Sequence, residues 1–322
     1  MDRRLFVAGL CGSALALPSL SPARAQTAAT RIIYPFAAGG GGDTICRLIA
    51  EEIRKPLARQ VIVENRTGAD GLIAIRAVKN AAPDGTTILV TTGPTMYLLP
   101  MVEHSPSFDA MKDFVPVSLL GRFEFGIIVG AAVPAKTFPE LVAWLKANPD
   151  RRSFGVPSNG TLPHFMGTVI EKALGFTLTR VPYRGGALVV NDVVGGHLPF
   201  GIITTADGFA QHKAGNLRII AVGSDTRSPD LPDVGTLREA GIDLVADAYF
   251  SMWLPAGTPA QIASAISNAT MAAVAQPSVA EKFRALSVIP VGSDPAALVK
   301  EFERNVAFWK PVVESTGYKI SG

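Results

Sequence analysis

Residues Tyr34 to Ile53 read YPFAAGGGGDTICRLIAEEI, in which four consecutive glycines separate an apolar run from a helical pattern. The residues RIIYPF (31–36) are β-branched and aromatic, which predicts a short buried strand. After the glycines, apolar residues recur at helical spacing, with Asp43 or Thr44 as the helix N-cap. The glycines therefore lie at a strand-to-helix turn, where free backbone amides and the helix dipole favour an anion.

The glycine run matches neither of two nucleotide-binding motifs. A phosphate-binding loop requires Gly-Lys-Ser/Thr where this chain has Gly42, Asp43 and Thr44. The dinucleotide fingerprint requires glycines at its first, third and sixth positions, and the sixth falls on Thr44 or Ile45. From the run alone, a tight turn that packs a helix on a sheet and a loop that contacts an anion both stay open.

Residues 1–25 have the pattern of a cleaved signal peptide. An arginine pair at 3–4 precedes an apolar stretch, and residues 23–25 read ARA, an A-x-A cleavage site. The residues RRLFV also fit a twin-arginine pattern loosely, so the Sec and Tat routes are both open. The apolar stretch is short and interrupted by a proline, which argues against a membrane anchor. We expect export to the periplasm.

Length and composition restrict the function classes. The chain has 322 residues, enough for two domains. Removal of residues 1–25 takes away three arginines and one aspartate, which lowers the formal net charge from +3 to +1 and leaves no electrostatic footprint for nucleic acid. Cys46 would be the one cysteine of the mature chain, so we expect a small buried residue and no intramolecular disulfide. Scattered histidines without cysteine partners predict no metal site. We expect a monomer without metal or nucleotide cofactor.

Strand-like and helix-like segments alternate along the mature chain, which predicts an α/β fold. Residues 115–133 read as one or two strands about Gly121, and residues 228–241 as a proline-rich loop with a short helix. No low-complexity linker divides the chain, so we expect two α/β lobes joined by crossing strands. One lobe would contain residues 26–122 and 251–322, and the other residues 123–250.

Strand-to-helix turns should face the cleft between such lobes, as in other open α/β sheets. Four turns have suitable polar groups: residues 37–43, SNGT (158–161), YRGG (183–186) and TTGPT (91–95). A cleft built from them would be rich in neutral donors and poor in acids, which suits an anionic ligand.

The chain resembles the Bug-type solute-binding receptors of tripartite tricarboxylate transport systems over nearly its whole mature length. The resemblance rests on motifs in the family's order: YPFAAGGGGD, VIVENRTGADG, APDGTTIL, KDFVPVSLL, PSNGTLPHF, VPYRGG, KAGNLRIIAV and LPAGTP. It implies a type II periplasmic binding protein fold and a receptor, not an enzyme, that binds a small carboxylate. The partner would be a membrane permease of such a transporter or, alternatively, a membrane sensor kinase.

The resemblance also implies the ligand-binding positions, where backbone amides, hydroxyls and ordered waters would hold the acid. These positions are Phe36, Ala38, Gly39, Gly40, Gly41, Gly42, Thr92, Gly93, Thr95, Asn159, Gly160, Thr161, His164, Tyr183, Arg184, Gly185, Gly186 and Thr204. His164 would either contact the ligand or fix its loop, and Arg184 would either bind a distal carboxylate or face solvent. We expect Asp43 to cap the first helix, and Arg66 to anchor its turn to neighbouring carbonyls.

Three departures from the family pattern bear on the ligand. Pro157 replaces a common hydroxyl residue, Leu72 replaces a common Asn, and Ile203 replaces an acidic residue of members that bind amino acids. An acidic amino acid is therefore disfavoured against an apolar or aromatic acid or a di- or tricarboxylic acid. Apolar walls could come from four side chains that are otherwise typical of a core: Phe36, Tyr97, Phe250 and Leu162.

An exported hydrolase is a remote alternative. It would need a nucleophile with a base, and the G-x-S-x-G motif is absent. Around Ser158, Pro157 precedes and Asn159 follows, so the serine does not lie on such an elbow.

Overall fold

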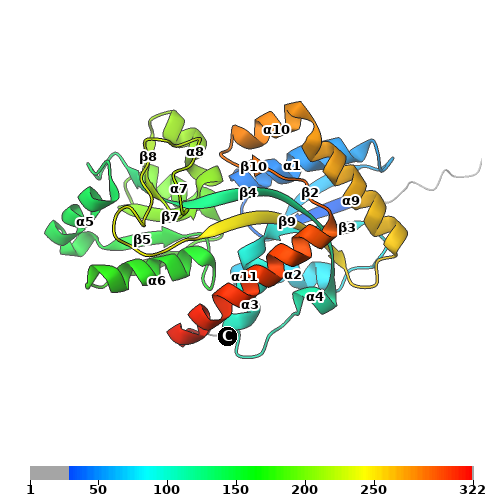
Figure 1. Cartoon of the computed structure of the whole chain (residues 1–322), viewed down its shortest axis with the longest axis horizontal. Coiled ribbons are helices and arrows are strands. Elements are labelled where there is room, and N and C mark those ends of the chain that lie inside the picture. The colour runs from blue at the N-terminus through cyan, green and yellow to red at the C-terminus, as the bar shows by residue number, and fades with distance from the viewer. Residues whose placement is uncertain (1–28, 321–322) are drawn as a thin grey trace, which may run out of the picture.

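The computed structural model describes residues 29–320, so the predicted signal peptide lies outside the described residues. Within that range, helices and strands alternate and form two α/β lobes joined by long strands (Figure 1). No helix between residues 29 and 320 combines the length and apolarity needed to cross a bilayer.

The first lobe is built on three parallel strands. Strand β1 (Thr30–Tyr34) lies between β2 (Val61–Asn65) and β3 (Thr87–Thr92). Every residue of β3 is buried, as expected for a parallel strand with helices on both faces. The helices of this part are α1 (Gly41–Arg54), α2 (Leu72–Lys79), α3 (Gly93–Val102) and the short α4 (Ala110–Asp113).

The second lobe repeats this arrangement. Strand β5 (Ser153–Val156) pairs in parallel with β6 (Thr179–Pro182) and β7 (Phe200–Thr204). The rings of Phe154 and Phe200, on neighbouring strands, stack with centroids 5.5 Å apart. The remaining elements are β8 (Leu217–Val222), α5 (Phe138–Ala147), α6 (Leu162–Leu174), α7 (Gly186–Val194) and α8 (Thr205–Lys213).

Two antiparallel strands connect the lobes. Strand β4 (Phe114–Gly130) is one continuous strand of 17 residues. Strand β9 (Asp247–Pro255) pairs along the whole of its own length with the first part of β4. The register of this pairing shifts between Leu119 and Gly121. Gly121 is the residue about which the sequence suggested one or two strands. The sheet order is β2-β1-β3-β9-β4-β7-β5-β6, with β8 also paired to β4. The lobe boundaries given above fall within these two strands and stay a prediction.

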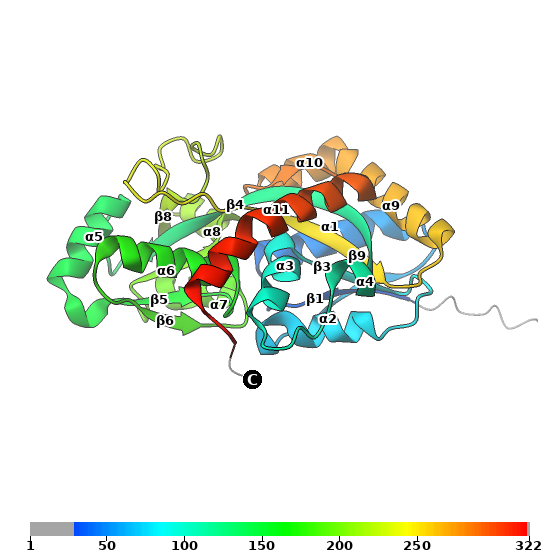
Figure 2. The same cartoon turned by 60° about the horizontal axis from the view of Figure 1, so that its bottom comes forward.

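The last part of the chain returns over the first lobe. Helices α9 (Ala260–Ala275) and α10 (Pro277–Arg284) precede β10 (Ile289–Pro290), which pairs with β4. Helix α11 (Pro295–Thr316) then runs from the first lobe towards α6 of the second (Figure 2). Beyond it, the edge of the Tyr318 ring contacts His164 of α6, with centroids 4.2 Å apart. The C-terminal residues thus touch both lobes.

The predicted α/β fold with two lobes and crossing strands is confirmed. One local prediction is wrong, because residues 228–241 contain turns and no helix. Thr236 and Glu239 exchange the bonds of a capping box, but Gly241 has a φ of +85° and ends the segment after one turn.

Candidate functional site

A cavity lies between the two lobes beside the glycine run. The space between the wall residues amounts to about 470 Å³ when the part that opens to solvent is included. Its wall is formed by Tyr34, Phe36, Ala37, Gly40, Thr92, Pro94, Thr95, Phe125, Pro157, Thr161, Leu162, Pro163, Gly186, Ala187, Thr204 and Asp207.

Five helix N-termini meet at this cavity. Gly40 is the N-cap of α1, Thr92 of α3, Thr161 of α6 and Thr204 of α8, and Gly186 is the first residue of α7. All five line the wall. Because the N-terminus of a helix carries about half a positive charge, the convergence adds positive potential to a wall that has no basic side chain.

Close packing explains most of the glycine run. A β-carbon on Gly40 would collide with the Asp207 carboxylate, and one on Gly42 with the Tyr34 hydroxyl. On Gly41 it would lie 2.5 Å from the β-carbon of Ala206 and 2.6 Å from its carbonyl oxygen. Gly39 has open space but a φ of +89°, which side-chain-bearing residues rarely adopt. The glycines therefore bring α1 of the first lobe against α8 of the second.

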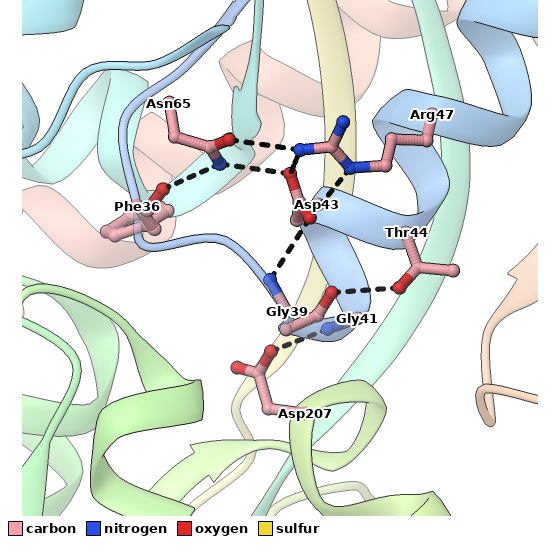
Figure 3. A network of polar contacts seen from close by, with 9 residues as sticks. Phe36, Gly39, Gly41, Asp43, Thr44, Arg47, Asn65 and Asp207 are labelled. Carbon is pink, nitrogen blue, oxygen red and sulfur yellow. Dashed lines mark hydrogen bonds and ion pairs between the residues drawn. The ribbon is translucent and has the colours of Figure 1, made fainter. Parts of the chain in front are cut away.

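The amides of this run are partly occupied by the protein's own carboxylates (Figure 3). The Gly41 amide donates to Oδ1 of Asp207 at 2.8 Å, across the two lobes. The Gly39 amide donates to Oδ2 of Asp43 at 3.1 Å. Of the four glycines, Gly40 lies on the cavity wall. Of the Ala38 to Gly42 amides that the resemblance assigned to a ligand carboxylate, those of Gly39 and Gly41 are therefore bonded within the protein.

Asp207 places one acid in the cavity wall, which sequence reasoning did not foresee. Its amide donates to the hydroxyl of Thr204, which in turn donates to Oδ2 of Asp207 at 2.9 Å. Burial raises the pKa of Asp207, and the hydrogen bonds from Thr204 and Gly41 oppose that rise. The sequence TTADG resembles a capping box, and this signal could have located the residue.

Asp43 caps α1 from inside its first turn. The helix begins at Gly41 with Gly40 as N-cap, so neither Asp43 nor Thr44 occupies the predicted N-cap position. The buried Asp43 carboxylate accepts from the Gly39 amide, from Asn65 at 3.0 Å and twice from Arg47 at 3.0 Å (Figure 3). Burial would raise the pKa of Asp43, but these bonds outweigh it and lower the pKa.

Threonine hydroxyls provide the other polar groups of the wall. The hydroxyls of Thr92 and Thr95 lie 2.7 Å apart, and the Thr95 amide donates to Thr92. The Thr161 hydroxyl donates to the Ser158 carbonyl at 2.9 Å and keeps its own acceptor capacity. These groups belong to α3 and α6, whereas the Asp207 carboxylate belongs to α8, so the two kinds of polar group come from different elements.

The structure brings seven of the predicted positions to the cavity wall: Phe36, Gly40, Thr92, Thr95, Thr161, Gly186 and Thr204. It places eleven others off that wall: Ala38, Gly39, Gly41, Gly42, Gly93, Asn159, Gly160, His164, Tyr183, Arg184 and Gly185. Sequence reasoning missed the wall residues Tyr34, Phe125, Ala187 and Asp207. Of the proposed apolar walls, Phe36 and Leu162 line the cavity, whereas Tyr97 and Phe250 lie in the core.

Three of the displaced positions line a neighbouring hollow that shares Phe36 and Pro157 with the cavity wall. They are Asn159, Tyr183 and Arg184. The Tyr183 hydroxyl donates to Asp192, and the Arg184 side chain is exposed. Arg66 pairs with the Glu64 carboxylate at 2.6 Å, so its predicted anchoring to carbonyls is wrong.

His164 fixes the loop before α6. Its Nδ1 accepts from the Gly160 amide at 3.0 Å, and its ring stacks on Phe165 with centroids 5.0 Å apart. The side chain is buried, and burial followed by the charge of Arg180 lowers the pKa of His164 to about 3. Of the two roles left open by the sequence, these contacts favour the loop-fixing one.

We expect His164 to make the fold sensitive to acid. Because its folded pKa is below the unfolded value, the unfolded chain binds the extra proton between about pH 6.5 and 3. Stability from this group is complete above pH 6.5 and should fall by about 2 kcal/mol at pH 5. Melting temperatures from pH 4 to 7 for the wild type and His164→Gln test this, since glutamine retains an acceptor without titrating. Parallel curves for the two proteins would contradict it.

Comparison with known proteins agrees with this architecture. Residues 45–318 match the family model described as the tripartite tricarboxylate transporter family receptor. The chain belongs to this receptor family. It is 34% identical over 295 residues to the UPF0065 protein in the TAR-I ttuE-ttuC' intergenic region of Agrobacterium vitis, covering 89% of this chain and 84% of that protein.

Solved structures of similar proteins have the same fold as this receptor. The periplasmic binding protein BugD has a TM-score of 0.85 and 30% identity, covering 90% of this chain and 98% of its own. R. palustris Rpa4515 with adipate has a TM-score of 0.85 and 26% identity, with the same coverage. The predicted Bug-type resemblance is therefore confirmed, and the chain is a solute-binding receptor, not a hydrolase.

Between residues 29 and 320, no group of three or more His, Cys, Asp or Glu side chains is arranged to hold a metal ion. Cys46 is buried in α1. Burial and the neighbouring Asp43 carboxylate raise the pKa of its thiol, which disfavours the reactive thiolate.

Proposed function

We propose that this receptor captures a small organic carboxylate in the cavity between its lobes, in the periplasm, and delivers it to the membrane permease of a tripartite tricarboxylate transporter. The convergence of five helix N-termini on one cavity carries the proposal. Amides and positive dipole ends stabilise a carboxylate without a cationic side chain.

The lobes would close around the solute by bending at the crossing strands β4 and β9. Both lobes contribute wall residues, for example Thr95 from the first and Thr161 from the second. A solute that contacts wall residues of both lobes therefore stabilises the closed arrangement of the lobes. A permease could recognise this closed arrangement. Adipate in a similar receptor supports a carboxylate as the ligand class. The predicted signal peptide supports the periplasmic location, with a cleaved protein acting as a monomer.

A thermal-shift screen tests the carboxylate requirement. The purified mature protein would be incubated with mono-, di- and tricarboxylic acids and, as matched controls, with the primary amide of each acid. A solute at a hundredfold excess over its dissociation constant should stabilise the fold by about 2.7 kcal/mol, and its amide should not. Equal shifts for acid and amide would overturn the proposal.

Thr161→Val should weaken carboxylate binding about tenfold. The change keeps the side-chain shape but removes the hydroxyl, whose hydrogen can turn from the Ser158 carbonyl to the solute carboxylate. Calorimetry with the acid identified in the screen provides the dissociation constants. Thr168→Val is the control, because the Thr168 hydroxyl bonds within α6 to the His164 carbonyl and lies off the wall. Unchanged affinity in Thr161→Val would remove this hydroxyl from the site.

A further inference from the structure

We propose that the solute is a zwitterion, an amino acid with an apolar side chain, and that Asp207 holds its ammonium group. The proposal rests on the carboxylate-binding function above and specifies the chemistry of the same cavity.

The position of the Asp207 carboxylate supports this role. Its two oxygens are each bonded once, Oδ1 to the Gly41 amide and Oδ2 to the Thr204 hydroxyl. A carboxylate has about four acceptor positions, so acceptor capacity remains beside the cavity that Asp207 lines. The bonds to both lobes also fix the orientation of the side chain, which makes it a preorganised acceptor.

The charge of the wall favours a ligand with a positive group. Among the described residues that line the cavity, Asp207 is the one charged side chain, and none is Lys, Arg or His. A plain carboxylate would place a second negative charge near Asp207 without a cationic side chain to balance it. A zwitterion adds no net charge, and its ammonium forms a charge-assisted hydrogen bond with the aspartate.

The polar groups of the wall are divided in a way that suits such a ligand. Asp207 uses amide and hydroxyl donors at the N-termini of α1 and α8. The N-termini of α3 and α6, with Thr95 and Thr161, remain for the ligand carboxylate. Phe36, Phe125 and Leu162 provide the apolar part of the wall for the side chain.

This inference reverses the expectation drawn from Ile203. The sequence suggested that an ammonium group would lose its counter-charge, because Ile203 replaces the acidic residue of members that bind amino acids. Ile203 is fully buried, whereas Asp207, in the first turn of α8, supplies a carboxylate to the cavity.

The test uses pairs of ligands that differ in the amino group alone. The pairs are L-leucine with 4-methylpentanoate and L-phenylalanine with 3-phenylpropionate, with L-glutamate and glutarate added for an acidic side chain. Calorimetry on the mature wild-type protein should show at least tenfold tighter binding for the amino member of an apolar pair. In Asp207→Asn, which keeps the acceptor for Gly41, this preference should disappear.

Three outcomes overturn the inference. Equal or tighter wild-type binding of the deaminated member would do so while leaving the carboxylate function intact. If folded Asp207→Asn still binds the amino acid more tightly than the matched acid without the amino group, a residue other than Asp207 must hold the ammonium group. Failure of every acid and amino acid would remove the proposed function itself. If Asp207→Asn does not fold by circular dichroism, Asp207→Ser serves as the second variant, with the same loss of preference expected.

Discussion

Gly41→Val should abolish measurable solute binding while each lobe stays folded. The first atom of the new side chain would lie 2.5 Å from the Ala206 β-carbon and 2.6 Å from its carbonyl oxygen, well inside van der Waals contact. The obstacle is backbone of the other lobe, so it cannot move aside as a flexible side chain could. Because α1 and α8 could then not approach, we expect at least a hundredfold loss of affinity.

Calorimetry and small-angle scattering together measure this effect. With solute present, the scattering curve of Gly41→Val should indicate lobes that lie further apart than in the wild type with solute. Without solute, the melting temperature of Gly41→Val should lie modestly below that of the wild type. Thr44→Val is a matched control, because it places the same side chain in the same turn of α1 at an exposed position. Tight binding by a folded Gly41→Val protein would show that contact between α1 and α8 is not needed for capture.

Asp43→Asn should destabilise the fold by about 2 kcal/mol, a noticeable fraction of the stability of an ordinary domain. The change removes the charge that Arg47 pairs with at two positions, and it leaves the Gly39 amide with a weaker acceptor. The loss stays below that of a fully buried ion pair because the Arg47 side chain is 53% exposed and stays hydrated.

Denaturant unfolding at several pH values measures the Asp43 contribution. Its folded pKa is lowered, so the stabilisation is complete above the unfolded value near pH 4 and is lost as pH falls through the folded pKa. The wild type should therefore approach the stability of Asp43→Asn in acid. Arg54→Gln is the control, since Arg54 pairs with Glu51 on the exposed face of the same helix. A loss below about 1 kcal/mol at pH 7 would show that the network contributes little.

The sequence predicted the order of elements well because hydrophobic periodicity and helix end signals are local. The αL cap of α6 at Gly175 and the proline in the first turn of α5 are examples. The turns at 37–43, 91–95 and 158–161 could be assigned to one cleft because the carboxyl ends of parallel strands meet at one edge of a sheet.

The contacts across the cleft could not be predicted in the same way. The packing of Gly41 against Ala206 depends on how the two lobes meet. No local sequence pattern encodes the distance between the lobes. For the same reason, sequence reasoning missed Asp207, whose carboxylate bonds an amide of the other lobe. The sequence left His164 either as a ligand contact or as a residue that fixes its loop, and the bond from the Gly160 amide to its Nδ1 distinguishes the two.

The central place of β9 in the sheet determines when the first lobe can be completed during folding. Strand β9 lies between β3 and β4. The edges of β3 and β4 that face β9 therefore stay unpaired until residues 247–255 have been synthesised or released. Strands β5 to β7 need only nearby segments and can pair earlier. Contacts between distant segments form slowly because a long loop must be closed first. The half of the molecule that begins with the N-terminal strand is therefore the half that matures last, and until then the edges of β3 and β4 are open to pairing with other chains.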